Sequence, residues 1–116
     1  MIVPDRWTDQ WIAAWNDRDL DTLLSFYSDT IQLRSPLAKI YARDGLIRGK
    51  IELREYWTEA LRRLPNLSLT KVAVYTGHLA LTVHYRDNNL RNIVETILFD
   101  DCEKASVSTV CLDRVR

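Results

Sequence analysis

The spacing of the apolar residues changes at Pro65, and this change restricts most strongly how the chain can fold. Before Pro65 the apolar residues recur three and four positions apart, which is the period of one helical face. After it they alternate with polar residues, which is the period of a half-buried strand. Helices followed by sequential hairpins predict an α+β domain, with helices on one face of a mostly antiparallel sheet. The length of 116 residues is typical of one domain, so we expect a single domain over residues 1–116.

Three helices are predicted before Pro65, and Pro65-Asn66 ends the last of them. Pro4 suits the first turn of the first helix, and Asp19 can cap the second. A short strand over 31–34 and an irregular segment over 37–49 separate the second helix from the third. The apolar faces consist of Trp7, Trp11, Ala14 and Trp15 in the first helix, Leu20, Leu23, Leu24 and Tyr27 in the second, and Leu53, Tyr56, Trp57, Ala60, Leu61 and Leu64 in the third.

Four strands are predicted after Pro65, over residues 67–75, 78–86, 92–99 and 105–113. In the third strand both faces are apolar, whereas a two-layer domain needs only one apolar sheet face. The surplus face indicates a second buried surface, and we expect a homodimer through the outer face of the sheet. One face of this strand carries Ile93, Glu95, Ile97 and Phe99, and the other carries Val94, Thr96 and Leu98.

Charge and hydropathy argue against several classes of protein. Basic and acidic residues balance to a formal net charge of zero, whereas nucleic-acid binders usually carry a basic excess. No run of about 18 apolar residues is present, so no membrane span is predicted. The start "MIVPDRW" lacks the basic flank and apolar segment of a signal peptide, which favours a cytoplasmic protein.

The sequence gives little support for a metal or a cofactor. His78 and His84 are the only histidines, and neither belongs to a metal-binding pattern. The three glycines form no phosphate-binding loop, so we predict no cofactor. Cys102 and Cys111 are expected to be reduced thiols, because a pair of cysteines without a secretion signal is seldom a disulfide.

The order of the predicted elements resembles a known family. The stretch "WIAAWNDRDLDTLLSFYSDTIQLRSP", then Gly49, then "LREYWTEALRRLP" and four strands is similar to the SnoaL-like branch of the NTF2-like superfamily. This group includes ketosteroid isomerase, polyketide cyclases and limonene epoxide hydrolase. The resemblance implies a cone-shaped, curved antiparallel sheet wrapped around three N-terminal helices, with an apolar pocket at its wide end. It also implies dimerisation through the convex sheet face in many members, and it leaves the activity open.

Carried over by position, the resemblance does not favour steroid isomerisation. Ser35 stands where the isomerase has its carboxylate base, and a hydroxyl without an adjacent base cannot abstract a carbon-bound proton near neutral pH. Trp11 stands where the isomerase has an oxyanion-binding tyrosine, and Glu95 keeps the pocket acid. The two carboxylates and arginine of the epoxide hydrolase cannot be placed, because Arg43 would lack a second interior acid.

Glu95 is the strongest candidate for a catalytic residue. It lies in a strand whose two faces both look buried, so its carboxyl group must find a partner or keep its proton. One interpretation is a pocket acid with a raised pKa that acts as a general acid or hydrogen-bond donor. The other is a structural carboxylate paired with Arg34, Arg43 or Arg91.

Aromatic residues are the candidates for the pocket wall. Among the tryptophans of the first helix we expect Trp11 at the wall, Trp7 at the mouth or in the core, and Trp15 in the core. Trp57 corresponds, by the "REYW" match, to an aromatic residue that faces the cavity in the family. Two tyrosines are further candidates, and a hydroxyl next to Glu95 would make a polar spot. The candidate pocket residues are Trp11, Tyr27, Ser35, Trp57 and Tyr85.

Two other features receive weaker functional hypotheses. His84 is expected on the outer face of the sheet, and His78 in a turn. The charged run "ARDGLIRGK" is expected to be a solvated loop. Its alternative role is a lid over the pocket, where Arg43 or Arg48 would meet an anionic substrate.

These observations leave three functions open. The first is an acid–base isomerase or cyclase that acts on a small, cyclic, hydrophobic substrate, with Glu95 as the acid or base. The second is a pocket protein that binds a hydrophobic molecule without catalysis, which the missing second carboxylate favours. The third is an association module whose active surface is the sheet face.

Overall fold

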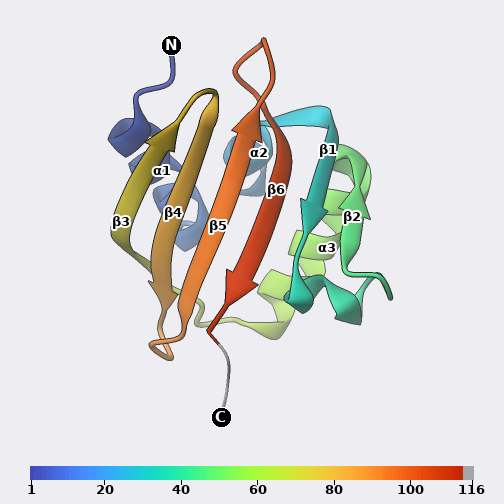
Figure 1. Ribbon diagram of the computed structural model, residues 1–116. Coiled ribbons are helices and arrows are strands. Elements are labelled where there is room, and N and C mark those ends of the chain that lie inside the picture. Colours follow the sequence, from blue (N-terminus) through green and yellow to red (C-terminus); the bar gives the residue numbers. More distant parts are fainter. Residues whose placement is uncertain (114–116) are drawn as a thin grey trace.

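A computed structural model describes residues 1–113, in which three helices lie on one face of a six-stranded sheet (Figure 1). The predicted α+β fold is therefore confirmed. The elements are α1 (Pro4–Asn16), α2 (Leu20–Leu24), β1 (Tyr27–Arg34), the short 3-10 helix η1 (Pro36–Ile40), β2 (Leu46–Arg48), α3 (Gly49–Arg63), β3 (Leu69–Gly77), β4 (Ala80–Asp87), β5 (Asn92–Phe99) and β6 (Ala105–Leu112).

The strands follow the order β2-β1-β6-β5-β4-β3 across the sheet. All neighbours are antiparallel except β1 and β6, which run parallel. The sheet is thus mixed, with one parallel pair in a mostly antiparallel arrangement. This pair joins a strand from the first third of the chain to the last described strand, so the hairpins predicted from the sequence could not reveal it.

The second helix is shorter than its apolar pattern predicts. The amide N–H of Ser25 bonds to the carbonyls of Asp21 and Thr22, and α2 ends there. The next residue, Phe26, already accepts a sheet bond from the N–H of Ala105 at 2.8 Å. Tyr27 therefore begins β1 rather than ending a helix, because pairing with β6 overrides the local helical spacing.

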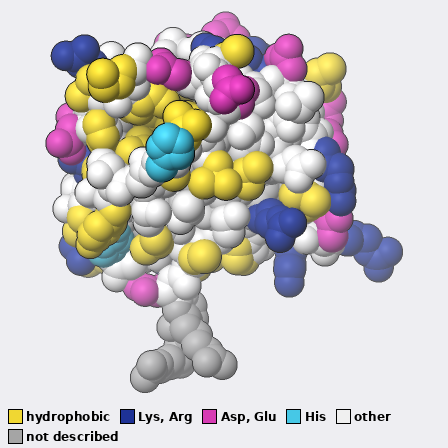
Figure 2. All heavy atoms as spheres, turned by 45° about the horizontal axis from the view of Figure 1, so that its top comes forward, with side chains coloured by type: hydrophobic (Ala, Val, Ile, Leu, Met, Phe, Trp, Pro, Cys, Tyr) yellow, Lys and Arg dark blue, Asp and Glu magenta, His cyan; other side chains and the backbone are white. Residues whose placement is uncertain are grey.

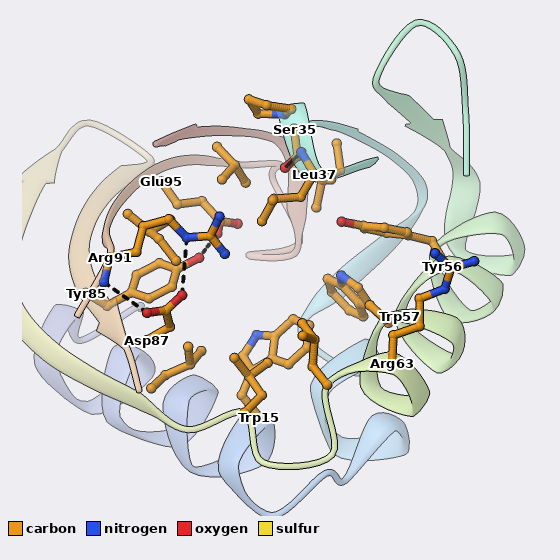
Figure 3. Close-up of a pocket in the computed structure, with 18 of the residues that line it drawn as sticks. Trp15, Ser35, Leu37, Tyr56, Trp57, Arg63, Tyr85, Asp87, Arg91 and Glu95 are labelled. Atoms are coloured by element: carbon orange, nitrogen blue, oxygen red, sulfur yellow. Dashed lines mark hydrogen bonds and ion pairs between the residues drawn. The ribbon is translucent and has the colours of Figure 1, made fainter. Parts of the chain in front are cut away.

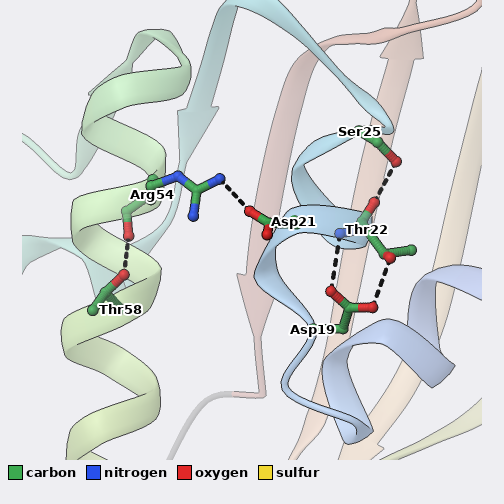
Figure 4. A network of polar contacts seen from close by, with 6 residues as sticks. All are labelled: Asp19, Asp21, Thr22, Ser25, Arg54 and Thr58. Carbon is green, nitrogen blue, oxygen red and sulfur yellow. Dashed lines mark hydrogen bonds and ion pairs between the residues drawn. The ribbon is translucent and has the colours of Figure 1, made fainter.

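Side-chain contacts fix α2 and tie it to α3 (Figure 4). Asp19 caps α2 by accepting hydrogen bonds from the N–H of Thr22 at 3.2 Å and from its hydroxyl at 2.6 Å. Arg54 of α3 donates to Asp21 at 2.7 Å. The cap satisfies backbone donors that a five-residue helix could not pair internally.

The core lies between the helices and the inner face of the sheet. Pro4 begins α1, whose buried face includes Trp7, Trp11 and Ile12. The rings of Trp7 and Trp11 stack with centroids 5.9 Å apart, and Trp7 meets Phe99 of β5 edge-on at 5.2 Å. Aromatic packing of this kind ties the first helix to the far end of β5.

The outer face of the sheet carries apolar side chains among uncharged polar ones, with charged groups mainly around its rim (Figure 2). Along β5 burial alternates strictly, and the outward Val94 and Leu98 are 38% and 43% exposed. Cys102 and Cys111 are exposed free thiols. Within residues 1–113, no helix is long and apolar enough to cross a membrane.

Candidate functional site

A cavity of about 330 Å³ opens between α3, η1 and the inner face of the sheet (Figure 3). Its size lies at the lower end of the range of small-molecule pockets. Most of the wall is apolar and aromatic, and a few polar groups converge on it. The apolar part includes Trp15, Leu33, Trp57, Leu67, Leu69 and Ile93, and the polar part consists of Ser35, Arg63, Tyr56, Tyr85, Asp87, Arg91 and Glu95.

Glu95 lies in the cavity wall because the alternation of β5 turns it inward beside Ile93 and Ile97. Its side chain is nearly fully buried. The hydroxyl of Tyr85, on β4, donates to Oε1 at 2.8 Å, and the hydroxyl of Ser108, on β6, donates to Oε2 at 2.6 Å. The two neighbouring strands thus hold the carboxyl group from both sides.

The environment of Glu95 favours its protonated form. Burial raises the pKa of this carboxyl group, against smaller lowering effects from the hydroxyls of Ser108 and Tyr85. Among residues 1–113 no arginine, lysine or histidine forms an ion pair with it. The structural pairing considered from the sequence, with Arg34, Arg43 or Arg91, is therefore wrong.

Two phenol groups line the same cavity as this carboxyl group. Burial raises the pKa of Tyr85 well above its ordinary value, and the charge of Glu95 adds to the shift. Burial also raises the pKa of Tyr56 to about 12, against a smaller lowering by the Ser35 hydroxyl. Both tyrosines keep their protons at neutral pH, so they can serve as hydrogen-bond donors.

Ser35, Trp57, Tyr85 and Glu95 all line the cavity. Ser35 directly follows β1 and caps η1, because its hydroxyl oxygen accepts the N–H of Leu37 at 3.1 Å. The proline that follows begins η1, which bends the chain over the cavity. The structure therefore brings four of the six candidate site residues to one cavity.

The expected positions of Trp11 and Tyr27 are corrected by the structure. The indole N–H of Trp11 donates to the hydroxyl of Tyr27 at 2.9 Å, and each side chain is only 1% exposed. Trp11 also packs edge-on against Tyr85, with centroids 5.4 Å apart. Trp11 and Tyr27 therefore lie behind the cavity wall. They pack against each other, and Trp11 packs against Tyr85, which leaves no room for a ligand beside them.

Trp15 lies at the cavity in place of Trp11, although the sequence analysis assigned it to the core. Its ring meets Trp57 edge-on, with centroids 4.9 Å apart. Its buried indole N–H has no hydrogen-bond partner among residues 1–113. Trp11 and Trp15 are four positions apart on one face of α1, so their spacing alone could not show which of them reaches the cavity.

Arg91 and Asp87 are also part of the wall, and the sequence analysis considered Arg91 only as a partner for Glu95. Nε of Arg91 donates to Oδ2 of Asp87 at 3.2 Å. The sequence does contain a signal, because Asp87 falls in a turn pattern four residues before an arginine at the start of a strand. Arg91 comes directly before β5 and lines the same cavity as Glu95, four residues later.

The alternative role of the 42–50 segment as a lid finds no support in the cavity wall. Neither Arg43 nor Arg48 lines the cavity, and Arg48 forms an exposed ion pair with Asp44 at 2.9 Å.

His84 hydrogen-bonds Asn92, one of its neighbours across the β4–β5 pair. Within residues 1–113, no three His, Cys, Asp or Glu side chains come together as a metal site.

The arrangement can donate a hydrogen bond, or a proton, inside an apolar cavity. When Glu95 is ionised, both neighbouring hydroxyls donate to it. When it is protonated, Tyr85 or Ser108 can turn to accept, because each hydroxyl can act in either role. The cluster can therefore hold the carboxyl group by hydrogen bonds in either protonation state.

The family model described as SnoaL-like domain matches residues 8–92. A SnoaL-like protein of unknown function from Burkholderia thailandensis is 31% identical, with a TM-score of 0.89, over 95% of this chain and 93% of that one. No curated protein matches the sequence.

Two solved structures share the fold at lower identity. TerC, co-crystallised with polyporic acid, is 16% identical with a TM-score of 0.76, over 91% of this chain and 88% of that one. SalBIII, an epoxide hydrolase/cyclase-like enzyme in pyran ring formation in the polyether salinomycin, is 13% identical with a TM-score of 0.74, over 94% and 89%.

Proposed function

Because the chain belongs to the SnoaL-like family, we propose that it binds a small, apolar, cyclic molecule in its cavity and acts on it by acid–base catalysis. Glu95 is the acid in this proposal. The compound would lie against Trp15, Trp57 and Ile93, with an oxygen atom at the carboxyl group.

The observation that carries the proposal is a buried carboxyl group in the wall of an apolar cavity, held by hydroxyls and by no cation of residues 1–113. A carboxyl group whose pKa is raised by burial can protonate a substrate oxygen, as general acids in apolar sites do. The structural similarity to TerC and SalBIII supports small organic molecules as the class to test.

The proposed step is proton transfer to a carbonyl oxygen. Glu95 donates its proton, which makes the adjacent C–H bond more acidic, and the carboxylate that remains is held by Tyr85 and Ser108. The carboxylate then takes a second proton, that of the α-carbon, which leaves the enol of the substrate and restores the carboxyl group of Glu95. Ser35 and Tyr56 lie across the cavity as neutral groups that orient the substrate.

The second candidate function is binding without catalysis. Asp87, the other acid of the cavity, accepts from the N–H groups of Asn89 and Arg91 and from Nε of Arg91. Asp87 is therefore occupied by the turn and by Arg91, and among residues 1–113 Glu95 is the other acid of the wall. Acid–base enzymes usually use two tuned groups, so this observation favours a binding protein.

Glu95→Gln distinguishes the two functions. Apolar ring ketones, lactones and epoxides are screened by thermal shift, and compounds that bind are then assayed for turnover. We expect at least one class to raise Tm, since a ligand at about 100 times its Kd adds about 2.7 kcal/mol to the stability.

For an enzyme, Glu95→Gln abolishes turnover and leaves binding within about tenfold, whereas the exposed control Asp101→Asn changes neither. Binding without turnover in the unchanged protein would identify a binding protein. Failure of every class to bind would contradict the pocket proposal itself.

We also propose a homodimer through the outer face of the sheet. Val94 and Leu98 are outward apolar side chains at the middle of this face, and apolar patches of this kind often mark interfaces. Sedimentation at tens of micromolar should give a dimer that Leu98→Glu dissociates. A monomer under these conditions would contradict the proposal.

Localisation in the cytoplasm stays a prediction from the sequence.

A further inference from the structure

Building on the proposed function, we infer that the molecule bound in the cavity carries a carboxylate group that Arg91 holds at one end. This inference specifies the substrate class: a cyclic apolar acid with an oxygen function at its other end, directed to Glu95.

Asp87 holds Arg91 in a defined position. Asp87 is only 6% exposed, and its Oδ1 accepts the N–H groups of Asn89 and Arg91, both at 2.9 Å. Its Oδ2 accepts Nε of Arg91 at 3.2 Å. Because the turn fixes the carboxylate, the carboxylate in turn fixes the plane of the guanidinium group.

This contact leaves one edge of the guanidinium group available. Nε is engaged, whereas Nη1 and Nη2 make no hydrogen bond to any of residues 1–113. That edge presents two parallel N–H groups, the geometry that binds both oxygens of a carboxylate. Figure 3 shows the guanidinium group of Arg91 reaching over the cavity from the side of Asp87.

Arg63 is the other arginine of the wall, but its charged group is engaged elsewhere. Its Nε donates to Glu59 at 2.8 Å, four residues back along α3. Figure 3 shows its guanidinium group beside α3 rather than over the cavity. Arg63 is therefore a matched control, a cation of the same kind in the same wall with a different orientation.

The spacing along the strand indicates what lies between the two ends. Arg91, directly before β5, and Ile93 and Glu95 within β5 are two residues apart in turn, and all three line the cavity. In an extended chain their backbone positions span about 13 Å at roughly 3.3 Å per residue. Ile93 lies between the arginine and the glutamate in this row. A ligand that matches all three has an apolar ring body between a carboxylate and a carbonyl oxygen.

Three related compounds test the inference by calorimetry. Acetylnaphthalene offers only the carbonyl group, naphthoate only the carboxylate, and an acetylnaphthoate with its two groups on opposite rings offers both. They are titrated into the unchanged protein, Arg91→Gln, Arg91→Lys, Arg63→Gln and Glu95→Gln. Thermal unfolding of each variant establishes that it is folded.

We expect the acetylnaphthoate to bind the unchanged protein at least about tenfold more tightly than acetylnaphthalene, as a charge-assisted bidentate contact requires. Arg91→Gln should remove this preference, Arg91→Lys should restore part of it because charge without the fork is less effective, and Arg63→Gln should leave it unchanged. Binding of acetylnaphthalene should stay within about threefold in all three arginine variants.

Two results would overturn the inference. Equal binding of acid and ketone by the unchanged protein would do so and would leave the proposed function intact. A preference for the acid that survives in Arg91→Gln, with only Tm lowered, would make the Asp87–Arg91 pair a structural brace of the hairpin. Acid binding through Arg91 with no turnover of any compound by the unchanged protein would instead leave this inference intact and contradict the proposed catalytic role of Glu95.

Discussion

Trp11 and Trp15 lie one turn apart in the same helix, but their indole N–H groups have different surroundings. That of Trp11 donates to Tyr27 inside a closely packed aromatic region with Trp7 and Phe99. That of Trp15 has no partner among residues 1–113 and belongs to a residue of the cavity wall. We call these two parts the packed region and the cavity region.

The difference shows how one helix serves two purposes. In the packed region, aromatic side chains fill the space, and the buried donor of Trp11 has its acceptor. In the cavity region, space and a donor are left unused, which costs stability in the absence of a ligand. The stability of the protein should therefore depend mainly on the first region, and its ligand on the second.

Truncation of the two tryptophans should give the largest difference. Trp11→Ala should lower the free energy of unfolding by about 3–5 kcal/mol, because it opens a cavity in a packed core. Trp15→Ala should cost at least about 1 kcal/mol less, since its ring already borders empty space. Urea unfolding followed by circular dichroism measures both values. Equal losses would show that the two regions are equally packed.

Removal of the N–H groups alone sharpens the comparison. Trp11→Phe should cost about 1–3 kcal/mol more than Trp15→Phe, because only the first substitution removes a hydrogen bond and leaves the buried Tyr27 oxygen without its donor. The same urea titrations give the result. If Trp15→Phe is as costly, its N–H group has a partner in solution.

The pH dependence of stability tests the cavity region separately. Burial raises the pKa of Glu95 in the folded state, so its contribution is fully present below the unfolded value near 4.5 and is lost as the pH rises through the folded value. Glu95→Gln lacks this loss, and its stability relative to the unchanged protein should grow with pH. Each unit of pKa shift corresponds to about 1.4 kcal/mol.

Thermal unfolding between about pH 4 and pH 8 makes this measurement. Tyr85→Phe removes a hydroxyl that lowers the pKa of Glu95. The pH-dependent loss of stability due to Glu95 should therefore extend to higher pH in this variant. A stability difference between Glu95→Gln and the unchanged protein that does not vary with pH would show an unshifted carboxyl group.

The smallest effect is expected outside both regions. Asp21 pairs with Arg54 on the exposed surface, and such pairs contribute about 0–1 kcal/mol. Asp21→Ala should therefore change the free energy of unfolding by less than about 1 kcal/mol and alter no ligand affinity. A larger loss in urea unfolding would mean that the α2–α3 contact matters more than either interior region.

The fold was largely predictable because its signals are local. The periods of three to four and of two, together with Pro4, Asp19 and Pro65, mark helices and strands without reference to distant residues. Which strand pairs with β1 was not predictable, because it depends on contacts between remote parts of the chain. The same contacts moved Tyr27 from the expected helix to the start of β1.

The site was predictable only in part. Glu95 could be selected because a carboxylate inside an apolar strand pattern is costly unless it has a partner. The choice between Trp11 and Trp15 could not be made, since both lie on one helical face and only the packing of Tyr27 and Tyr85 distinguishes them. Arg91 was missed as a wall residue because the orientation of an arginine depends on its partner, Asp87.

The place of β6 in the sheet has a consequence for synthesis of the chain. β6 lies between the β1–β2 pair and the strands β3, β4 and β5. The two groups are therefore joined into one sheet only through β6. On the ribosome, the first 104 residues can form helices and a β3–β5 meander, but the sheet stays in two parts. Ser108, a partner of Glu95, arrives with this same strand. The carboxyl group of Glu95 therefore acquires both of its hydroxyl partners only after β6 has emerged from the exit tunnel and joined the sheet.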